Sequence, residues 1–223
     1  MTLAGAAASV WLAATAERAE ADFVFSMAQV GPDVVLTGQG SMYVHELFDD
    51  MAPQQALIVP RINPGAPSAT LSGGSLGAVD TYSMVIAETG APFSITGPAN
   101  FGTGGYTSGS AGIGGDSFGF GFADSGASRT FSVYVPTGYT GAGDQGLNGS
   151  TTFFNQTYAS LGITPGSYAW ALQSAIEPLT ENISVSVAPA PIPLPPSVLL
   201  LGAGVLALVA VGAGNRKRTM KIS

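Results

Sequence analysis

The chain has 223 residues, 14 acidic and 7 basic, and a formal net charge of −7. It has no cysteine, which excludes a disulfide framework and thiol chemistry. Between Asp22 and Pro191 there are 12 acidic residues against only Arg61 and Arg129, a net charge of about −10. Such an acidic segment excludes nucleic-acid binding by phosphate neutralisation.

The N-terminus is typical of a secretory signal. Leu3 to Ala16 is an apolar, alanine-rich run, and Ala19 and Ala21 form an A-x-A cleavage pattern after it. Residues 14–16 are a second candidate for cleavage, and no Lys or Arg precedes the run. A buried or amphipathic first helix is the alternative. We expect a signal-peptide-like segment over residues 1–21.

The middle of the chain has many short stretches in which apolar residues alternate with small or polar ones, the period of a half-buried β-strand. A hairpin is expected where Phe23–Val30 and Val34–Thr37 flank a Gly-Pro-Asp turn. Residues 42–51 fit either a short helix or a strand that leads into a loop. Further strands are expected at 57–59, 80–87, 92–96, 116–122, 129–135, 151–154, 168–172 and 183–187, and a single helical turn at 158–161.

Two segments are rich in glycine, serine and proline. Residues 64–77 are predicted to be a loop, and residues 97–115 are predicted to be a loop or an irregular edge. Eight of the 19 residues in the second are glycine, which cannot fill a core and loses the most backbone entropy on ordering. Short strands joined by such turns, with little helix, predict an all-β fold. We expect a β-sandwich or jelly-roll-like ectodomain over residues 22–188.

The C-terminal 35 residues consist of a proline-rich stalk (189–197), an apolar run (198–214) and a basic tail (215–223). The run has 17 residues and no charge, the lower limit for a helix that crosses a hydrocarbon core of ~30 Å. Lipid cannot satisfy free backbone groups, so a single transmembrane helix is expected here, in contact with membrane lipid. The alternative, a buried core helix, rarely ends in such a basic cluster. A stop-transfer signal is expected at Arg216, Lys217 and Arg218.

This order of segments resembles the C-terminal sorting signal of PEP-CTERM proteins of Gram-negative bacteria. The motif is Ile192-Pro193-Leu194-Pro195-Pro196, similar to the variant that runs Val-Pro-Leu-Pro-Ala. Ile192 stands for the Val, and Pro196 stands for the Ala at the processing site. The resemblance implies a partner, an exosortase-type transpeptidase, that removes the helix. The precursor would then lie in the inner membrane and the mature protein at the cell surface or outside the cell.

The last third of the ectodomain also resembles the domains that carry such signals. The matching residues are V-P-T-G-Y at 135–139 and S-L-G-I-T-P-G-S-Y-A-W at 160–170. The family often has Trp-x-Trp-Gly after the tyrosine, whereas Trp170 is followed here by Ala-Leu. The resemblance implies a role at the cell surface or in biofilm, with exopolysaccharide as a further partner.

Residues for chemistry are few. His45 is the only histidine and lies near Glu46, Asp49 and Asp50, but one histidine without cysteine gives no zinc spacing. No G-x-S-x-G elbow occurs. The oxygen ligands for Ca²⁺ could come from Asp116, Asp124 and Asp144, although solvated loop carboxylates explain them better. We therefore predict no catalytic residue, no metal and no cofactor.

Three hypotheses follow, in order of preference. The first is a non-enzymatic exported protein of structural or adhesive type, sorted by its C-terminus. The second is a calcium- or glycan-binding lectin-like module that uses loops such as 97–115. The third is a hydrolase that depends on His45.

Overall fold

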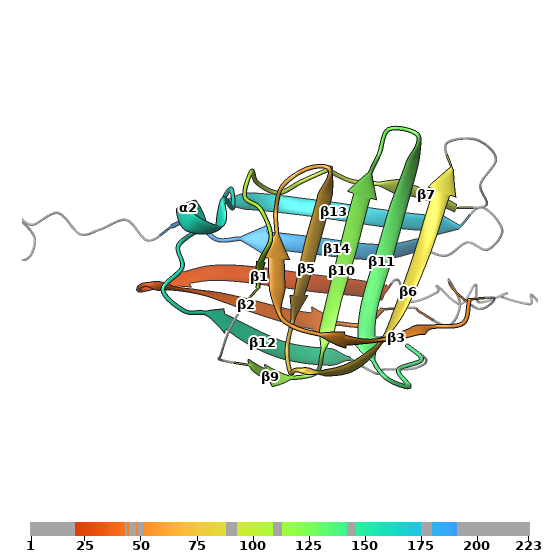
Figure 1. The fold of residues 1–223 in the computed structure, drawn as a ribbon, viewed down its shortest axis with the longest axis horizontal. Helices are drawn as coiled ribbons and strands as arrows, with labels where there is room; N and C mark the ends of the chain where they lie inside the picture. Colours follow the sequence, from red (N-terminus) through yellow and green to blue (C-terminus); the bar gives the residue numbers. More distant parts are fainter. Residues whose placement is uncertain are drawn as a thin grey trace, which may run out of the picture. The chain divides into compact units, whose positions relative to one another are not determined.

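The computed structural model describes residues 21–42, 44, 48, 51–87, 93–108, 113–141, 146–174 and 180–190. Contacts divide the chain into two units, Met1–Pro189 and Ala190–Ser223. The described part of the first unit consists of two seven-stranded sheets and one four-residue helix (Figure 1). The predicted all-β, sandwich-like fold is confirmed.

Sheet A contains the first and last strands of the unit as neighbours at its centre. Its order is β7-β13-β14-β1-β2-β12-β9. The strands are β7 (Phe93–Thr96), β13 (Gly166–Ser174), β14 (Thr180–Val187), β1 (Ala21–Val30), β2 (Asp33–Gly40), β12 (Leu147–Phe153) and β9 (Ile113–Gly115). Every pair is antiparallel except β1–β14, which is parallel.

Sheet B is antiparallel throughout and lies in front of sheet A in Figure 1, where its strands run steeply across those behind. Its order is β3-β6-β11-β10-β5-β4-β8. The strands are β3 (Gln54–Ile58), β6 (Gly77–Ala87), β11 (Ser128–Pro136), β10 (Phe118–Asp124), β5 (Ser68–Gly73), β4 (Arg61–Asn63) and β8 (Thr107–Ser108). Such crossing of two sheets is the orthogonal class of sandwich packing.

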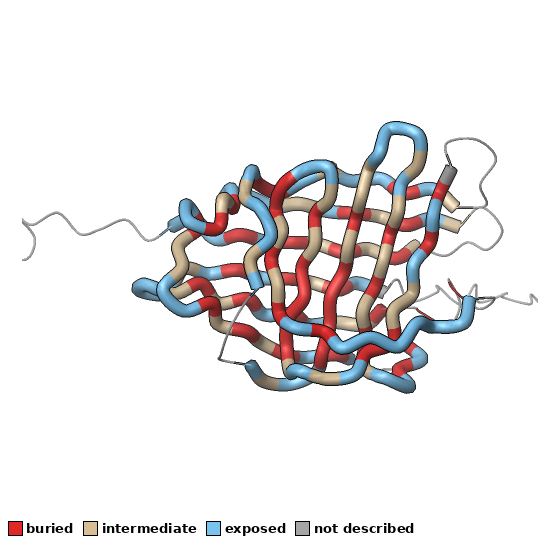
Figure 2. Tube along the Cα trace, in the orientation of Figure 1, coloured by how far each residue is buried: buried red, intermediate tan, exposed pale blue. Residues whose placement is uncertain are grey.

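The core between the sheets is built on aromatic residues from alternating positions. Phe25 of β1 lies 5.6 Å from Phe118 and 5.2 Å from Phe120 of β10, measured between ring centroids. Trp170 of β13 lies 4.9 Å from Phe120. All of these side chains are buried, and Figure 2 shows the alternation of buried and exposed positions along the strands. The strand predicted at 116–122 is confirmed in β10, where Phe118, Phe120 and Phe122 are all buried.

Several local predictions are confirmed. The β1–β2 hairpin pairs Val30 with Asp33 across the predicted turn. The helical turn is α2 (Tyr158–Leu161), which ends at Gly162 with a left-handed φ of 64°. Most of residues 42–50 lie outside the described residues, so the choice between helix and strand stays a prediction. Among those described, the Phe48 amide donates to the Val44 carbonyl at 3.1 Å.

The prediction of a loop over 64–77 is wrong. Strand β5 lies within this segment, pairs with β10 and buries Ala69 and Leu71. Its small residues are needed because the aromatic rings of β10 fill the space beside them. A Cβ on Gly73 would lie only 3.0 Å from the Phe118 ring. The sequence therefore looks like a loop although the backbone forms a central strand.

The prediction of a loop or irregular edge over 97–115 is confirmed, since the strands in this segment are short and lie at sheet edges. The short strands β8 and β9 lie within it, and Phe101 is fully buried. The Thr103 amide donates to the Gly162 carbonyl at 2.8 Å. A Cβ on Gly104 would overlap the Leu161 carbonyl oxygen, so glycine allows this segment to pack directly on α2. These glycines therefore serve close backbone packing.

We predict that Phe118→Ala lowers the free energy of unfolding by about 3–5 kcal/mol, because it leaves a cavity between the sheets. Denaturant unfolding followed by Trp fluorescence measures this. Phe154→Ala is the matched control, since Phe154 is 46% exposed and should change stability little. Equal effects of the two substitutions would contradict the assigned core.

Candidate functional site: the C-terminal junction

The parallel pairing of β1 and β14 fixes where the chain enters and leaves the sandwich. The register runs from Ala21 opposite Glu181 to Met27 opposite Val187. At a rise of about 3.3 Å per residue, these two ends are roughly 20 Å apart. The chain therefore enters β1 at one end of the pair and leaves β14 at the other. The C-terminal exit lies at the end where β1 turns into β2.

Two hydrogen bonds converge on one carbonyl at this exit. The Met27 carbonyl accepts the Ala188 amide at 2.9 Å and the Tyr158 hydroxyl at 2.9 Å. The Tyr158 amide also donates to the Gln29 side-chain oxygen at 3.2 Å. The end of β1, helix α2 and the first residue after β14 are thus tied together. We call Met27, Gln29, Tyr158, Val187 and Ala188 the C-terminal junction.

The sequence around α2 explains how Tyr158 reaches this position. Thr157 caps the helix, accepting the Ser160 amide, and the Ser160 hydroxyl accepts the Thr157 amide in return. Gly162 then reverses the chain into β13. Tyr158 is 3% exposed. Burial raises the pKa of its phenol above the usual value.

The chain beyond the junction is accessible where the structure describes it. Val187 is buried, whereas Ala188, Pro189 and Ala190 are all exposed. The junction therefore marks the boundary between the packed sandwich and the proline-rich stalk.

Most of the predicted sorting residues lie outside the described residues. These are Ala19, the motif Ile192, Pro193, Leu194, Pro195 and Pro196, the apolar run 198–214, and Arg216, Lys217 and Arg218. The predictions made for them stay predictions. Ala21 is the first residue of β1. Across the part of the chain that the structure describes, no helix has the length and apolar character to cross a membrane.

Of the three candidate calcium ligands, the structure describes Asp116, just before β10, and Asp124, at the end of β10. An Asp116 oxygen accepts the Asn148 amide at 2.9 Å, which fixes the start of β12. The Asp124 carboxylate lies in the β10–β11 hairpin, and Asp144 lies outside the described residues. Among the described residues, no group of three or more potential metal ligands occurs.

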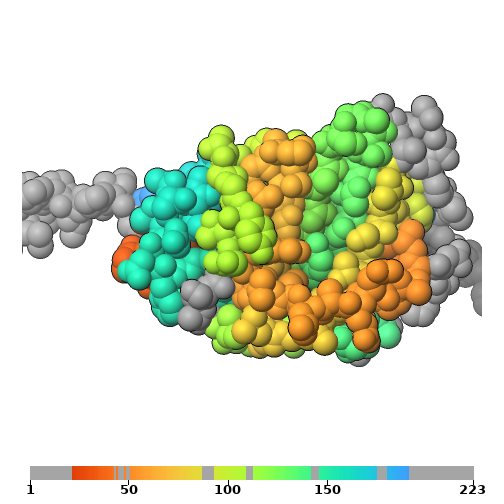
Figure 3. All heavy atoms as spheres, in the orientation of Figure 1, coloured from red at the N-terminus to blue at the C-terminus, as the bar shows by residue number. Residues whose placement is uncertain are grey.

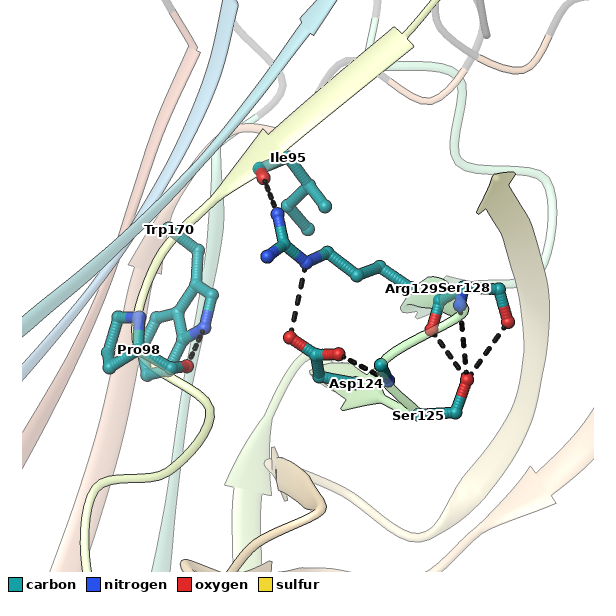
Figure 4. A network of polar contacts seen from close by, with 8 residues as sticks. Ile95, Pro98, Asp124, Ser125, Ser128, Arg129 and Trp170 are labelled. Atoms are coloured by element: carbon teal, nitrogen blue, oxygen red, sulfur yellow. Dashed lines mark hydrogen bonds and ion pairs between the residues drawn. The ribbon is translucent and has the colours of Figure 1, made fainter. Parts of the chain in front are cut away.

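Asp124 instead helps to join the two sheets, as Figure 4 shows. Its carboxylate accepts the Gly126 amide at 2.9 Å and the Arg129 side chain at 3.2 Å. Arg129 also donates to the Ile95 carbonyl of β7 at 3.2 Å, which connects sheet B to sheet A. The Gly126 amide, and then Arg129, lower the pKa of Asp124 below its usual value.

The residues that hold the C-terminal junction and the turn after β11 in place were not identified from the sequence. Tyr158 was recognised only as part of a helical turn, because nothing local shows that its hydroxyl meets β1. Asp80 was also missed: it is 6% exposed and accepts the Gly138 amide at 2.9 Å, which fixes the turn after β11. His45 lies outside the described residues, so its proposed chemistry stays a prediction.

Comparison with known proteins gave no matching family model and no similar curated protein or solved structure.

We predict that Tyr158→Phe lowers the free energy of unfolding by about 1 kcal/mol, because the buried Met27 carbonyl loses one hydrogen bond. Hydrogen exchange should also show weaker protection of the Ala188 amide. Tyr106→Phe is the matched control, since Tyr106 is 59% exposed. Unchanged stability and unchanged protection in Tyr158→Phe would contradict the role of this hydroxyl.

The lowered pKa of Asp124 predicts a pH-dependent contribution to stability. A carboxylate whose pKa is lower in the folded state stabilises the fold above its unfolded pKa of about 3.9. This contribution is lost as the pH falls through the lower, folded value. The melting temperatures of wild type and Asp124→Asn should therefore differ most above about pH 5, and the difference should shrink as the pH falls below about 3.9 and through the lower, folded pKa.

The control for this experiment is Asp22→Asn, since Asp22 is an exposed acid on the other sheet. If the difference in melting temperature between wild type and Asp124→Asn stays constant from pH 7 to about pH 2.5, the ionisation of Asp124 does not contribute to stability and the prediction is contradicted.

Proposed function

We propose that the chain is the precursor of an exported cell-surface or extracellular-matrix protein of structural or adhesive type. The observation that carries the proposal is the C-terminal junction. The last strand ends at Val187, the next residues are exposed, and the proline motif Ile192–Pro196, an uncharged apolar run and a basic tail follow within the same chain. This order supports a domain delivered by a C-terminal sorting signal.

In this proposal each segment has a separate task. Residues 1–21 direct the chain across the inner membrane, and residues 198–214 hold the precursor in the lipid as a single helix. The basic tail from Arg216 keeps the C-terminus inside. An exosortase-type transpeptidase then acts at Ile192–Pro196 and passes the ectodomain, a jelly-roll-like sandwich, to the cell surface. Exopolysaccharide is the proposed partner there.

The use of the carboxylates supports a role without catalysis. Asp80, Asp116 and Asp124 each accept a backbone amide, and Asp124 is also paired with Arg129. The positions of these three acids are therefore explained by the backbone hydrogen bonds that they accept. The net charge of about −10 between Asp22 and Pro191 keeps such a domain soluble and repels anionic surfaces.

We predict that the surface form of the protein lacks residues 198–223. Intact-mass spectrometry of protein from the cell surface measures both termini at once. Replacing both Pro193 and Pro195 with Ala should leave the C-terminus attached and the protein in the inner membrane. Pro189→Ala is the matched control, since it changes a proline outside the motif.

A surface form that retains residues 198–223 would contradict processing. A surface form without these residues from the double variant would contradict the assignment of the motif.

A further inference from the structure

Among the described residues the two sheets have four edge strands, and three of them are protected against pairing with another chain. On β7 the Ile95 carbonyl accepts Arg129. Strand β8 has two residues, and β9 has three, with Asp116 directly after it. Short length and nearby charge are the usual means by which proteins protect sheet edges.

The fourth edge, β3, has none of these protections. It is the last strand of sheet B in the described residues and has five residues, Gln54–Ile58. Leu57 is 84% exposed and the adjacent Val59 is 44% exposed. The segment from Met51 to Pro60 contains no charged residue. In Figure 3, which looks onto sheet B, the atoms of β3 lie uncovered at the surface.

We propose that β3 is a self-association surface, where the β3 strands of two copies of this chain pair edge to edge and antiparallel. Pairing would satisfy the outward backbone groups of both strands and bury Leu57 of each copy. The proposal does not depend on the sorting signal, since it concerns only residues within the sandwich.

The charge distribution favours a second copy as the occupant. Two copies of a domain with a net charge of about −10 repel each other over most of their surfaces. The uncharged β3 edge is where they can approach without placing like charges opposite one another. Antiparallel pairing of identical strands is self-complementary, because each copy presents the same residues to the other.

The flanking prolines limit the assembly to a dimer. Pro53 and Pro60 bound β3 and have no amide hydrogen to donate to a longer ladder. When two copies pair about a two-fold axis, each uses its open β3 edge, and no open edge among the described strands is left for a third copy.

The test uses the full-length chain in detergent, studied by analytical ultracentrifugation over a range of concentrations. We expect a reversible dimer for wild type. Leu57→Lys should weaken dimerisation by about tenfold or more, because each edge then carries a charge. The matched control is Val85→Lys on β6, since Val85 is 68% exposed on the outer face of the same sheet. This variant should dimerise like wild type.

A wild-type chain that stays monomeric at about 100 µM, well above the micromolar range of ordinary association, would overturn the proposal. It would also be overturned if Leu57→Lys left the dimer intact, which would place the association elsewhere, the apolar run included. An equal loss of dimerisation in Leu57→Lys and Val85→Lys would assign the interface to the face of the sheet rather than to its edge. That result would also overturn the proposal.

Cysteine substitution gives an independent readout because the chain has no cysteine of its own. If the two-fold axis passes near the middle of β3, Cβ atoms of opposite residues lie about 4.5–5.5 Å apart, close enough for a disulfide. One of Gln55→Cys, Ala56→Cys or Leu57→Cys should form a disulfide dimer much faster than Val85→Cys. No preference over Val85→Cys would overturn the proposal.

Discussion

The parallel pairing of the first and last strands is the constraint on which the rest of this structure depends. It places β1 and β14 at the centre of sheet A, so neither strand can be removed without dividing the sheet. It also brings Phe25 into the core against Phe118 of the opposite sheet. A parallel pair needs a long connection between its strands, and here the connection is almost the whole domain. The first and last strands of the domain are thereby held together at the centre of sheet A.

That pairing also shapes the proposed function. The chain leaves the sandwich at a fixed point, where the Met27 carbonyl accepts both the Ala188 amide and the Tyr158 hydroxyl, and residues 188–190 are exposed. A sorting enzyme would find its motif a few residues beyond a rigid strand end. The N-terminal entry lies at the opposite end of the pair, so removal of a leader there leaves the C-terminal junction intact. The acidic side chains hold turns and join the sheets, which agrees with a mechanical or adhesive role.

Strand positions could be predicted from sequence where residue size alternates. Phe118, Phe120 and Phe122 alternate with small residues, and the structure buries all three. Prediction failed where small residues fill a strand, as in β5, because Gly73 and Ala69 show no hydrophobic period. These residues must be small because aromatic rings from a strand about 50 residues away in the sequence occupy the space beside them. No local pattern contains that information.

The sequence by itself determined the all-β class, the β1–β2 hairpin, the α2 turn and the acidic character of the domain. These depend on local periodicity, turn chemistry and composition, which neighbouring residues specify. Tertiary structure alone decided that β14 pairs in parallel with β1, that Tyr158 bonds Met27, and that Arg129 joins the two sheets. It also decided that β3 remains an open edge. These features depend on which distant strands become neighbours. Contacts between residues 34 positions apart (Arg129 and Ile95) or 131 positions apart (Tyr158 and Met27) leave no local trace in the chain.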